Sequence, residues 1–173
     1  LYVLKILFNM TRIGLLSDTH SYWDDAYLRH FKDCDEIWHA GDIGSISIIE
    51  QLASTGKKIR AVYGNIDGQD VRGQFPLHNR FTVEEVTVWM THIGGYPAKY
   101  NPNIIAELTK KPPMLFVCGH SHIAKVMYDK SLQMLHINPG AAGKQGFHAV
   151  RTLMRFVVDK EVMKDLEVIE LSQ

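Results

Sequence analysis

Side chains that could bind a metal ion recur along the chain in short polar clusters, each at the end of an apolar run. The clusters are SDTH (17–20), AGD (40–42), GN (64–65), MTH (90–92) and GHSH (119–122). Carboxylate oxygens, amide oxygens and imidazole nitrogens suit Mn²⁺, Fe, Co²⁺ and Zn²⁺, and the absence of cysteine from the clusters argues against a closed structural zinc site. The residue types therefore favour a catalytic metal site over a structural one.

The last cluster places His120 and His122 two residues apart behind Gly119. If the preceding run MLFVCG is a strand that stays extended beyond Gly119, side-chain alternation puts both imidazoles on one side, where they would converge on one point. A lone histidine in a soluble protein is more often a surface residue or a satisfied core residue than a ligand. The other clusters therefore decide whether the pair has partners.

The elements expected in the first half would bring the clusters together. Strands are expected at 12–17, 35–42 and 58–65, and helices at 24–33 and 45–55. Such a β-α-β-α-β order predicts parallel strands in a sheet covered by helices. In an open sheet of this kind, sites form beyond the carboxyl ends of the strands, so the clusters would share one crevice.

The second half predicts mostly antiparallel strands. Two strands joined at Glu84 and Glu85 are expected within 79–92, a helix within 101–111, a strand at 114–120, and hairpins at 124–138 and 151–171. The sequence shows no linker or internal repeat, so residues 10–173 are expected to form a single domain. Residues 1–9 are interpreted as an N-terminal extension ahead of Met10.

Composition sets bounds on the function. The 173 residues include 19 Lys+Arg and 19 Asp+Glu, for a formal net charge of zero, and 46% are hydrophobic. No basic track for extended nucleic-acid binding is visible, and the zero charge is compatible with a homo-oligomer. The apolar opening run is too short to cross a membrane, and two distant cysteines, Cys34 and Cys118, predict no disulfide framework and favour the cytoplasm.

The order of the clusters is more specific than any one of them. The series SDTH, AGDIG, YGNID, MTHIGG, CGHSH and INPGAAG, between residues 17 and 143, resembles the calcineurin-like metallophosphoesterases, particularly their small single-domain bacterial and archaeal phosphodiesterases. The resemblance implies an α/β fold, a four-layer αββα sandwich of two mixed β-sheets flanked by helices. It also implies a dinuclear metal centre at the strand ends.

The resemblance also implies a set of ligands for two divalent metal ions. One ion would be held by Asp18, His20, Asp42 and His122, and the other by Asp42, Asn65, His92 and His120, with Asp42 bridging them. Manganese is the preferred ion, with nickel, cobalt, zinc, iron and magnesium as alternatives.

The chemistry expected of such a centre is hydrolysis of a small phosphodiester by in-line attack of a metal-bridging hydroxide. Asn65 and the two ions would stabilise the charge that builds on the phosphoryl oxygens. A phosphomonoesterase, or a protein-binding scaffold like the retromer subunit Vps29, is the alternative reading of the same fold.

One position departs from the wider family. Many of its phosphomonoesterases have a histidine after the GN pair, whereas this chain has Ile66, which cannot donate a proton. Diesters and activated aryl esters are therefore expected to be better substrates than simple alkyl monoesters, because general-acid assistance is worth about 10²–10⁴-fold. Asp67, in the same loop, would orient a ligand or stabilise the turn.

His148, beyond the INPGAAG loop, is the candidate for the missing acid. It would have to come within hydrogen-bond reach of the leaving group to serve in that role. The remaining histidines match no ligand position and are interpreted as structural; they are His30, His39, His78 and His136.

Overall fold

The computed structural model describes residues 10–172, and the extension predicted for residues 1–9 lies outside them. The first sheet contains, in spatial order, β12 (Val162–Leu171), β11 (Arg151–Asp159), β1 (Met10–Leu16), β2 (Glu36–His39) and β3 (Lys58–Ala61). The second contains β4 (His78–Val83), β5 (Val86–Thr91), β8 (Leu115–Val117), β10 (Met134–Pro139) and β9 (Ala124–Asp129). A small hairpin consists of β6 (Gly95–Tyr96) and β7 (Lys99–Tyr100).

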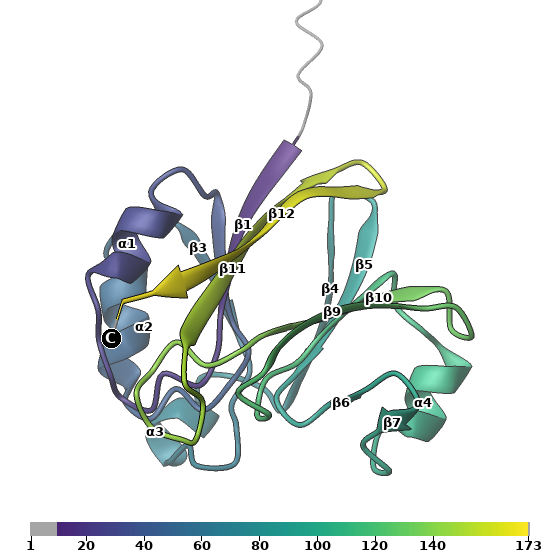
Figure 1. Ribbon diagram of the computed structural model, residues 1–173, viewed down its shortest axis with the longest axis horizontal. Helices are drawn as coiled ribbons and strands as arrows, with labels where there is room; N and C mark the ends of the chain where they lie inside the picture. The colour runs from purple at the N-terminus through teal and green to yellow at the C-terminus, as the bar shows by residue number, and fades with distance from the viewer. Residues whose placement is uncertain (1–9, 173) are drawn as a thin grey trace, which may run out of the picture.

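The helices lie on the two outer faces of the paired sheets (Figure 1). The first sheet is covered by α1 (Ala26–Phe31), α2 (Ile46–Ala53) and α3 (Gln69–Arg72), and the second by α4 (Ile105–Lys110). The predicted four-layer αββα sandwich of mixed sheets is therefore confirmed. The prediction of one domain over residues 10–173 stays a prediction. No helix within residues 10–172 is long and apolar enough to span a membrane.

Alternation along β1 explains how the layers are held together. Ile13 and Leu15 are buried in the core between the two sheets, where Trp38 of β2 also lies. Leu16 instead joins the core beneath the helices, which contains Phe31 of α1. Gly14 faces that helix, and a Cβ at this position would overlap the Phe31 ring. The period-2 pattern thus buries apolar side chains on both faces of the strand.

The strand directions agree with most of the prediction. β1, β2 and β3 run parallel, as the β-α-β-α-β pattern predicts. The three predicted hairpins of the second half, β4–β5, β9–β10 and β11–β12, are antiparallel, whereas β5, β8 and β10 run parallel to one another. The one-turn helix α3 and the hairpin β6–β7 were not predicted, because elements this short carry no readable periodicity.

A buried carboxylate also holds neighbouring strands together. Glu36 of β2 accepts hydrogen bonds from Arg60 Nε at 2.7 Å and from Trp38 Nε1 at 2.9 Å. Burial raises the pKa of Glu36, but these hydrogen bonds and the Arg60 charge lower it by more, so the pKa lies below its usual value of 4.5. The ionised form is therefore the one that stabilises the folded sheet.

Replacing Glu36 with glutamine should lower the free energy of unfolding by about 1–2 kcal/mol at neutral pH, because hydrogen bonds to a charged group become neutral ones. Since the folded-state pKa is depressed, the wild-type advantage is complete above pH 4.5 and is lost as the pH falls through the folded-state pKa. Denaturant unfolding across pH 3–7 measures the difference. Glu167→Gln, which breaks an exposed pair with Arg155, should cost less than about 1 kcal/mol; an equal cost for both would contradict the special role of Glu36.

Candidate metal centre

The predicted ligands all lie in loops that follow parallel strands, and both large sheets contribute. In chain order they follow β1 (Asp18, His20), β2 (Asp42), β3 (Asn65), β5 (His92) and β8 (His120, His122). The carboxyl ends of these strands open toward the seam between the sheets, so residues more than 100 positions apart meet there, as at His120 N–H and Asp18 Oδ2, 3.1 Å apart.

Five of these residues have left-handed backbone conformations. Positive φ angles occur at Asp18 (55°), His20 (46°), Asp42 (53°), His120 (69°) and His122 (58°). Each such conformation costs about 1–2 kcal/mol for a residue with a Cβ. Backbone hydrogen bonds between the loops hold the strained turns, including Asp18 N to Gly41 O at 2.9 Å and His20 N to Asp42 O at 3.0 Å.

These conformations correct the expectation for His120 and His122. β8 ends at Val117, and neither histidine is extended, so strand alternation does not place their side chains. The two imidazoles belong to different groups of metal-binding atoms and do not converge on one point. Gly119 precedes the first left-handed turn, at His120, and Ser121 separates it from the second, at His122. These two turns replace the extended geometry that alternation assumes.

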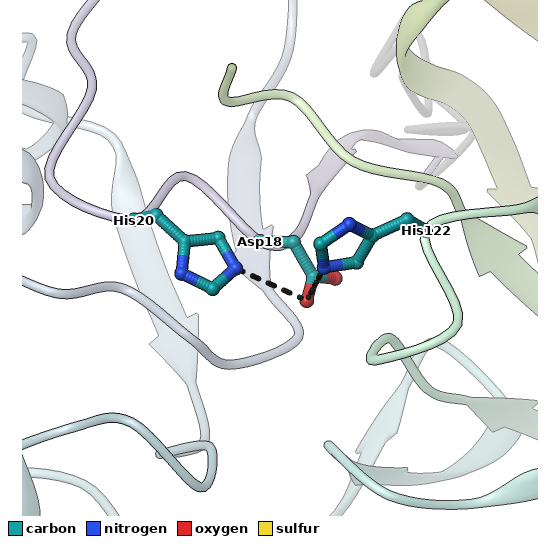
Figure 2. A group of neighbouring side chains, drawn as sticks. All are labelled: Asp18, His20 and His122. Atoms are coloured by element: carbon teal, nitrogen blue, oxygen red, sulfur yellow. Dashed lines mark ion pairs between the residues drawn. The ribbon is translucent and has the colours of Figure 1, made fainter. Parts of the chain in front are cut away.

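The first group consists of Asp18, His20 and His122 (Figure 2). Asp18 is buried, and its Oδ1 lies 3.1 Å from His122 Nε2 and 3.9 Å from His20 Nε2. Figure 2 shows both rings pointing their Nε2 atoms toward this oxygen. The three side chains therefore face a common space that an ion could occupy.

The second group consists of Asp42, His92 and His120. Asp42 Oδ2 lies 3.2 Å from His92 Nε2. His92 Nδ1 lies 2.8 Å from the carbonyl oxygen of Ala40, which can only accept, so Nδ1 carries the proton. In the neutral ring the lone pair of His92 Nε2 consequently faces the group, as a metal ligand requires.

The two groups form one continuous cluster. His20 Nε2 lies 3.7 Å from Asp42 Oδ2, and His92 Nε2 lies 3.9 Å from Asp18 Oδ1. Among the residues that the structure describes, Asp18 Oδ1, His20 Nε2 and His92 Nε2 are buried without a hydrogen-bond partner. Orphaned buried acceptors are costly, and cations would satisfy them. The donor set thus fits two divalent ions, with Asp42 between the groups.

The electrostatics of the cluster also favour the binding of cations. Burial raises the pKa of Asp18, but the adjacent imidazoles of His122 and His92 lower it by more. Burial lowers the pKa of His92, but the carboxylates of Asp42 and Asp18 raise it by more. The Asp18 carboxylate raises the pKa of His122. Protons on the imidazoles therefore balance the carboxylates, and binding of cations would displace them.

Two glycines, each directly before a predicted ligand, are needed for close approach. Gly41 has a φ of +96°, and a Cβ there would lie 2.6 Å from His92 Nδ1. A Cβ on Gly64 would overlap the Asp42 carboxylate. The absence of a side chain at both positions lets neighbouring loops touch beneath the ligands.

The loop after β3 places Asn65 beside the cluster. Ile66 N–H donates to Asp42 Oδ1 at 3.1 Å, so the Asn65–Ile66 turn lies against that carboxylate. Asp67 accepts hydrogen bonds from Gly64 N and Gly44 N, both at 2.7 Å. Of the two roles considered for Asp67, these contacts describe the loop-stabilising one. Asn65 itself is exposed, and its role as a ligand stays a prediction.

His148 lies next to the first group but is not a member of it. Its ring centroid is 5.2 Å from that of His122, and its Nε2 is 3.0 Å from the Gly143 carbonyl oxygen, to which it donates. Its Nδ1 is buried without a hydrogen-bond partner in the part of the chain that the structure describes. A cavity of about 230 Å³ adjoins it, lined by Lys144, His148, Ala149 and Arg151.

Sequence reasoning missed two buried residues that position the ligand loops. His39, interpreted only as a strand residue, accepts from Gly41 N at 3.2 Å and donates to Thr19 Oγ1 at 2.9 Å, and burial lowers its pKa to about 4. Asn138 donates to Gly119 O at 2.8 Å and to Ser121 Oγ at 3.1 Å. His39 lies in the motif HAGD and Asn138 in the motif INPG, so these motifs were the available signal.

Comparison with known proteins identifies the family of this chain. Residues 11–161 match the model of the calcineurin-like phosphoesterase superfamily domain. A probable metallophosphoesterase of Methanothermobacter thermautotrophicus is 28% identical over 134 residues, 75% of this chain and 76% of that protein. A phosphodiesterase of Methanocaldococcus jannaschii is 24% identical over 144 residues, 75% of this chain and 82% of that protein.

The fold also resembles that of vacuolar protein sorting 29 from Cryptosporidium parvum. The TM-score is 0.71 at 16% identity, over 95% of this chain and 99% of that chain. At this identity the likeness concerns the fold alone.

Adding Mn²⁺ or Zn²⁺ to chelator-treated protein should raise its thermal stability, because ions bind the orphaned acceptors of the folded state. At a metal concentration about 100 times Kd, the gain is about 2.7 kcal/mol. Asp18→Asn should reduce the gain to below about 0.5 kcal/mol if affinity falls about 100-fold. Calorimetry with and without metal measures both.

The matched control is Asp33→Asn, which alters an exposed carboxylate outside the cluster and should keep the full metal-dependent gain. Equal gains in the wild type and in Asp18→Asn would contradict an ion between Asp18, His20 and His122.

Proposed function

The chain belongs to the calcineurin-like phosphoesterase superfamily, and from this premise we propose that it is a metal-dependent phosphodiesterase that hydrolyses a small phosphodiester. The observation that carries the proposal is the pair of imidazole–carboxylate groups that share one space at the strand ends. The named phosphodiesterase relative supports the diester over the monoester.

The ligand assignment proposed is one ion at Asp18, His20, Asp42 and His122, and a second at Asp42, Asn65, His92 and His120. Manganese is the preferred ion. When bound, the two ions would supply Lewis acidity toward the phosphoryl oxygens and lower the pKa of a water molecule, which provides a nucleophile near neutral pH.

The protein's own groups would then orient the reaction. Asn65, held at the edge of the cluster by its Asp42-bonded neighbour, would donate to a phosphoryl oxygen on which charge develops. The Ile66 N–H would hold the Asp42 carboxylate in place by donating a hydrogen bond to it. The Ala40 carbonyl would keep the proton of His92 on Nδ1, away from the reacting phosphate.

The identity of residue 66 supports a diester substrate. Ile66 stands where family phosphomonoesterases have a proton-donating histidine, and its side chain is 46% exposed next to the cluster. Poor leaving groups would therefore need another acid, and His148 is the nearest candidate because its ring contacts that of His122.

A protein-binding scaffold is the second candidate, favoured by the structural likeness to vacuolar protein sorting 29. It ranks lower because a scaffold needs no orphaned ligand atoms, whereas this chain keeps three of them buried in the cluster. We also propose that the protein is located in the cytoplasm and that it forms a homo-oligomer.

Chelator-treated protein with a divalent ion restored should hydrolyse bis(p-nitrophenyl) phosphate faster than p-nitrophenyl phosphate. Mn²⁺, Ni²⁺, Co²⁺, Zn²⁺ and Mg²⁺ added back separately rank the ions. Asp42→Asn should lower kcat/KM by at least about 10³-fold, because it weakens both ion sites. Asp70→Asn, an exposed change on α3, should keep wild-type activity. Metal binding without turnover of either ester would favour the scaffold, and a preference for the monoester would contradict the diesterase.

His148→Asn tests the leaving-group acid. If His148 protonates the leaving oxygen, the variant should lose about 10²-fold in kcat on a diester with an alkyl leaving group. It should lose little on bis(p-nitrophenyl) phosphate, whose leaving group needs no proton. Steady-state rates on both substrates give the comparison. Equal losses on the two would assign His148 to positioning of His122 instead.

A further inference from the structure

Four large apolar side chains are exposed at positions adjacent in sequence to residues of the candidate site. Their exposed fractions are 46% for Ile66, 38% for Ile93, 62% for Ile123 and 109% for Phe147. They follow or precede Asn65, His92, His122 and His148 respectively. We call these four residues the apolar rim. Single exposed apolar residues need no explanation, but a group around a site does.

The backbone of the rim is fixed by the site itself. Ile66 N–H donates to Asp42 Oδ1 at 3.1 Å, and Ile123 N–H donates to Ser121 Oγ at 3.3 Å. Phe147 follows Gly146, whose φ is +127° and where a Cβ would overlap the His122 ring. The loop that carries Phe147 therefore packs directly on a predicted ligand. The rim cannot retreat from the site without moving the ligands.

Burying these side chains in the protein was open to the fold, as neighbouring positions show. Ile43, one position after the predicted ligand Asp42, and Val71 of α3 are fully buried. Burial of side chains of this size stabilises the folded protein, so the exposed rim forgoes that stabilisation. The lost free energy can be recovered when a ligand with apolar groups covers the rim.

The occupant follows from the geometry of a phosphodiester. Its phosphate must sit at the metal cluster, and its two ester arms leave phosphorus in directions away from the metal-facing oxygens. Both arms must therefore cross the residues that border the cluster. None of the four rim residues carries a charge, so they offer nothing to a further phosphate but a favourable surface to an apolar group.

We propose that the apolar rim is the specificity-determining surface of the site, and that it selects diesters whose ester arms are apolar or aromatic. This inference rests on the proposed phosphodiesterase function. An extended polyanion is the opposite kind of substrate, because its arms would bring further charges onto apolar side chains.

Binding of two poorly reactive diesters tests the inference without relying on turnover. Diphenyl phosphate and dimethyl phosphate present the same phosphate with aromatic or minimal arms. Mn²⁺-loaded wild-type protein should bind diphenyl phosphate at least about 10-fold more tightly, since two phenyl arms gain apolar contacts. Isothermal titration calorimetry gives both affinities, and their ratio is the readout.

The Ile123→Ser, Phe147→Ser double variant should reduce the ratio to below about 3-fold while leaving the affinity for dimethyl phosphate unchanged. Val162→Ser is the matched control, because Val162 is 57% exposed and lies in the β11–β12 hairpin. Asp159 of this hairpin pairs with the amino end of β1, whereas the ligand loop follows the carboxyl end of that strand. It should keep the wild-type ratio. The metal-dependent stability gain of each variant shows that the cluster is intact.

The outcomes separate the two proposals. A wild-type ratio near one, or a ratio that the double variant does not lower, would overturn the rim even if the protein hydrolyses diesters. A rim-dependent preference without hydrolysis of any diester would support the role of the apolar rim in binding and contradict the phosphodiesterase function. Absence of binding by either compound would overturn the rim as well.

Discussion

Two buried carboxylates, Asp18 and Asp42, lie among imidazoles, and the rest of the structure is organised around this concentration of charge. An uncompensated carboxylate in such a place is prohibitively costly. The protein lowers the cost with backbone N–H donors to both carboxylates, from His120 and Ile66. The oxygen and nitrogen atoms that still lack partners define where cations fit.

The double sheet provides the stiffness that this arrangement needs. Apolar side chains from both sheets, among them Trp38 and Met90, fill the space between them. This fixes the relative positions of strands whose carboxyl ends carry the ligand loops. Strained left-handed turns at the ligands persist because buried residues hold the same loops: His39 accepts a hydrogen bond from Gly41 N–H, and Asn138 donates one to Gly119 O. Packing energy from the core thus supports strain at the site.

Polarity changes sharply across the site, and this contrast connects the chemistry with the choice of substrate. The centre is charged and inward-facing, while the residues next to it in sequence are apolar and exposed, with Ile66 and Phe147 as examples. A phosphate diester has the same contrast, with a charged centre and two uncharged arms. In the proposed diesterase, isoleucine at position 66 would therefore have two consequences: this position supplies no acid, and it offers an apolar contact.

The sequence by itself determined the parallel β1–β2–β3 order and the loops on which the predicted ligands lie, because strand periodicity is a local signal. The αββα architecture was implied by the family resemblance that the ordered motifs carry. The family resemblance implied a division of the ligands between two ions, but only the tertiary structure gives its physical basis. His120 and His122, two residues apart, separate because their backbone turns are left-handed, a conformation fixed by contacts with β1 and β10 loops that no local pattern reports. Tertiary structure also decided the role of Asn138 and the exposure of the apolar rim, since burial depends on which distant segments meet.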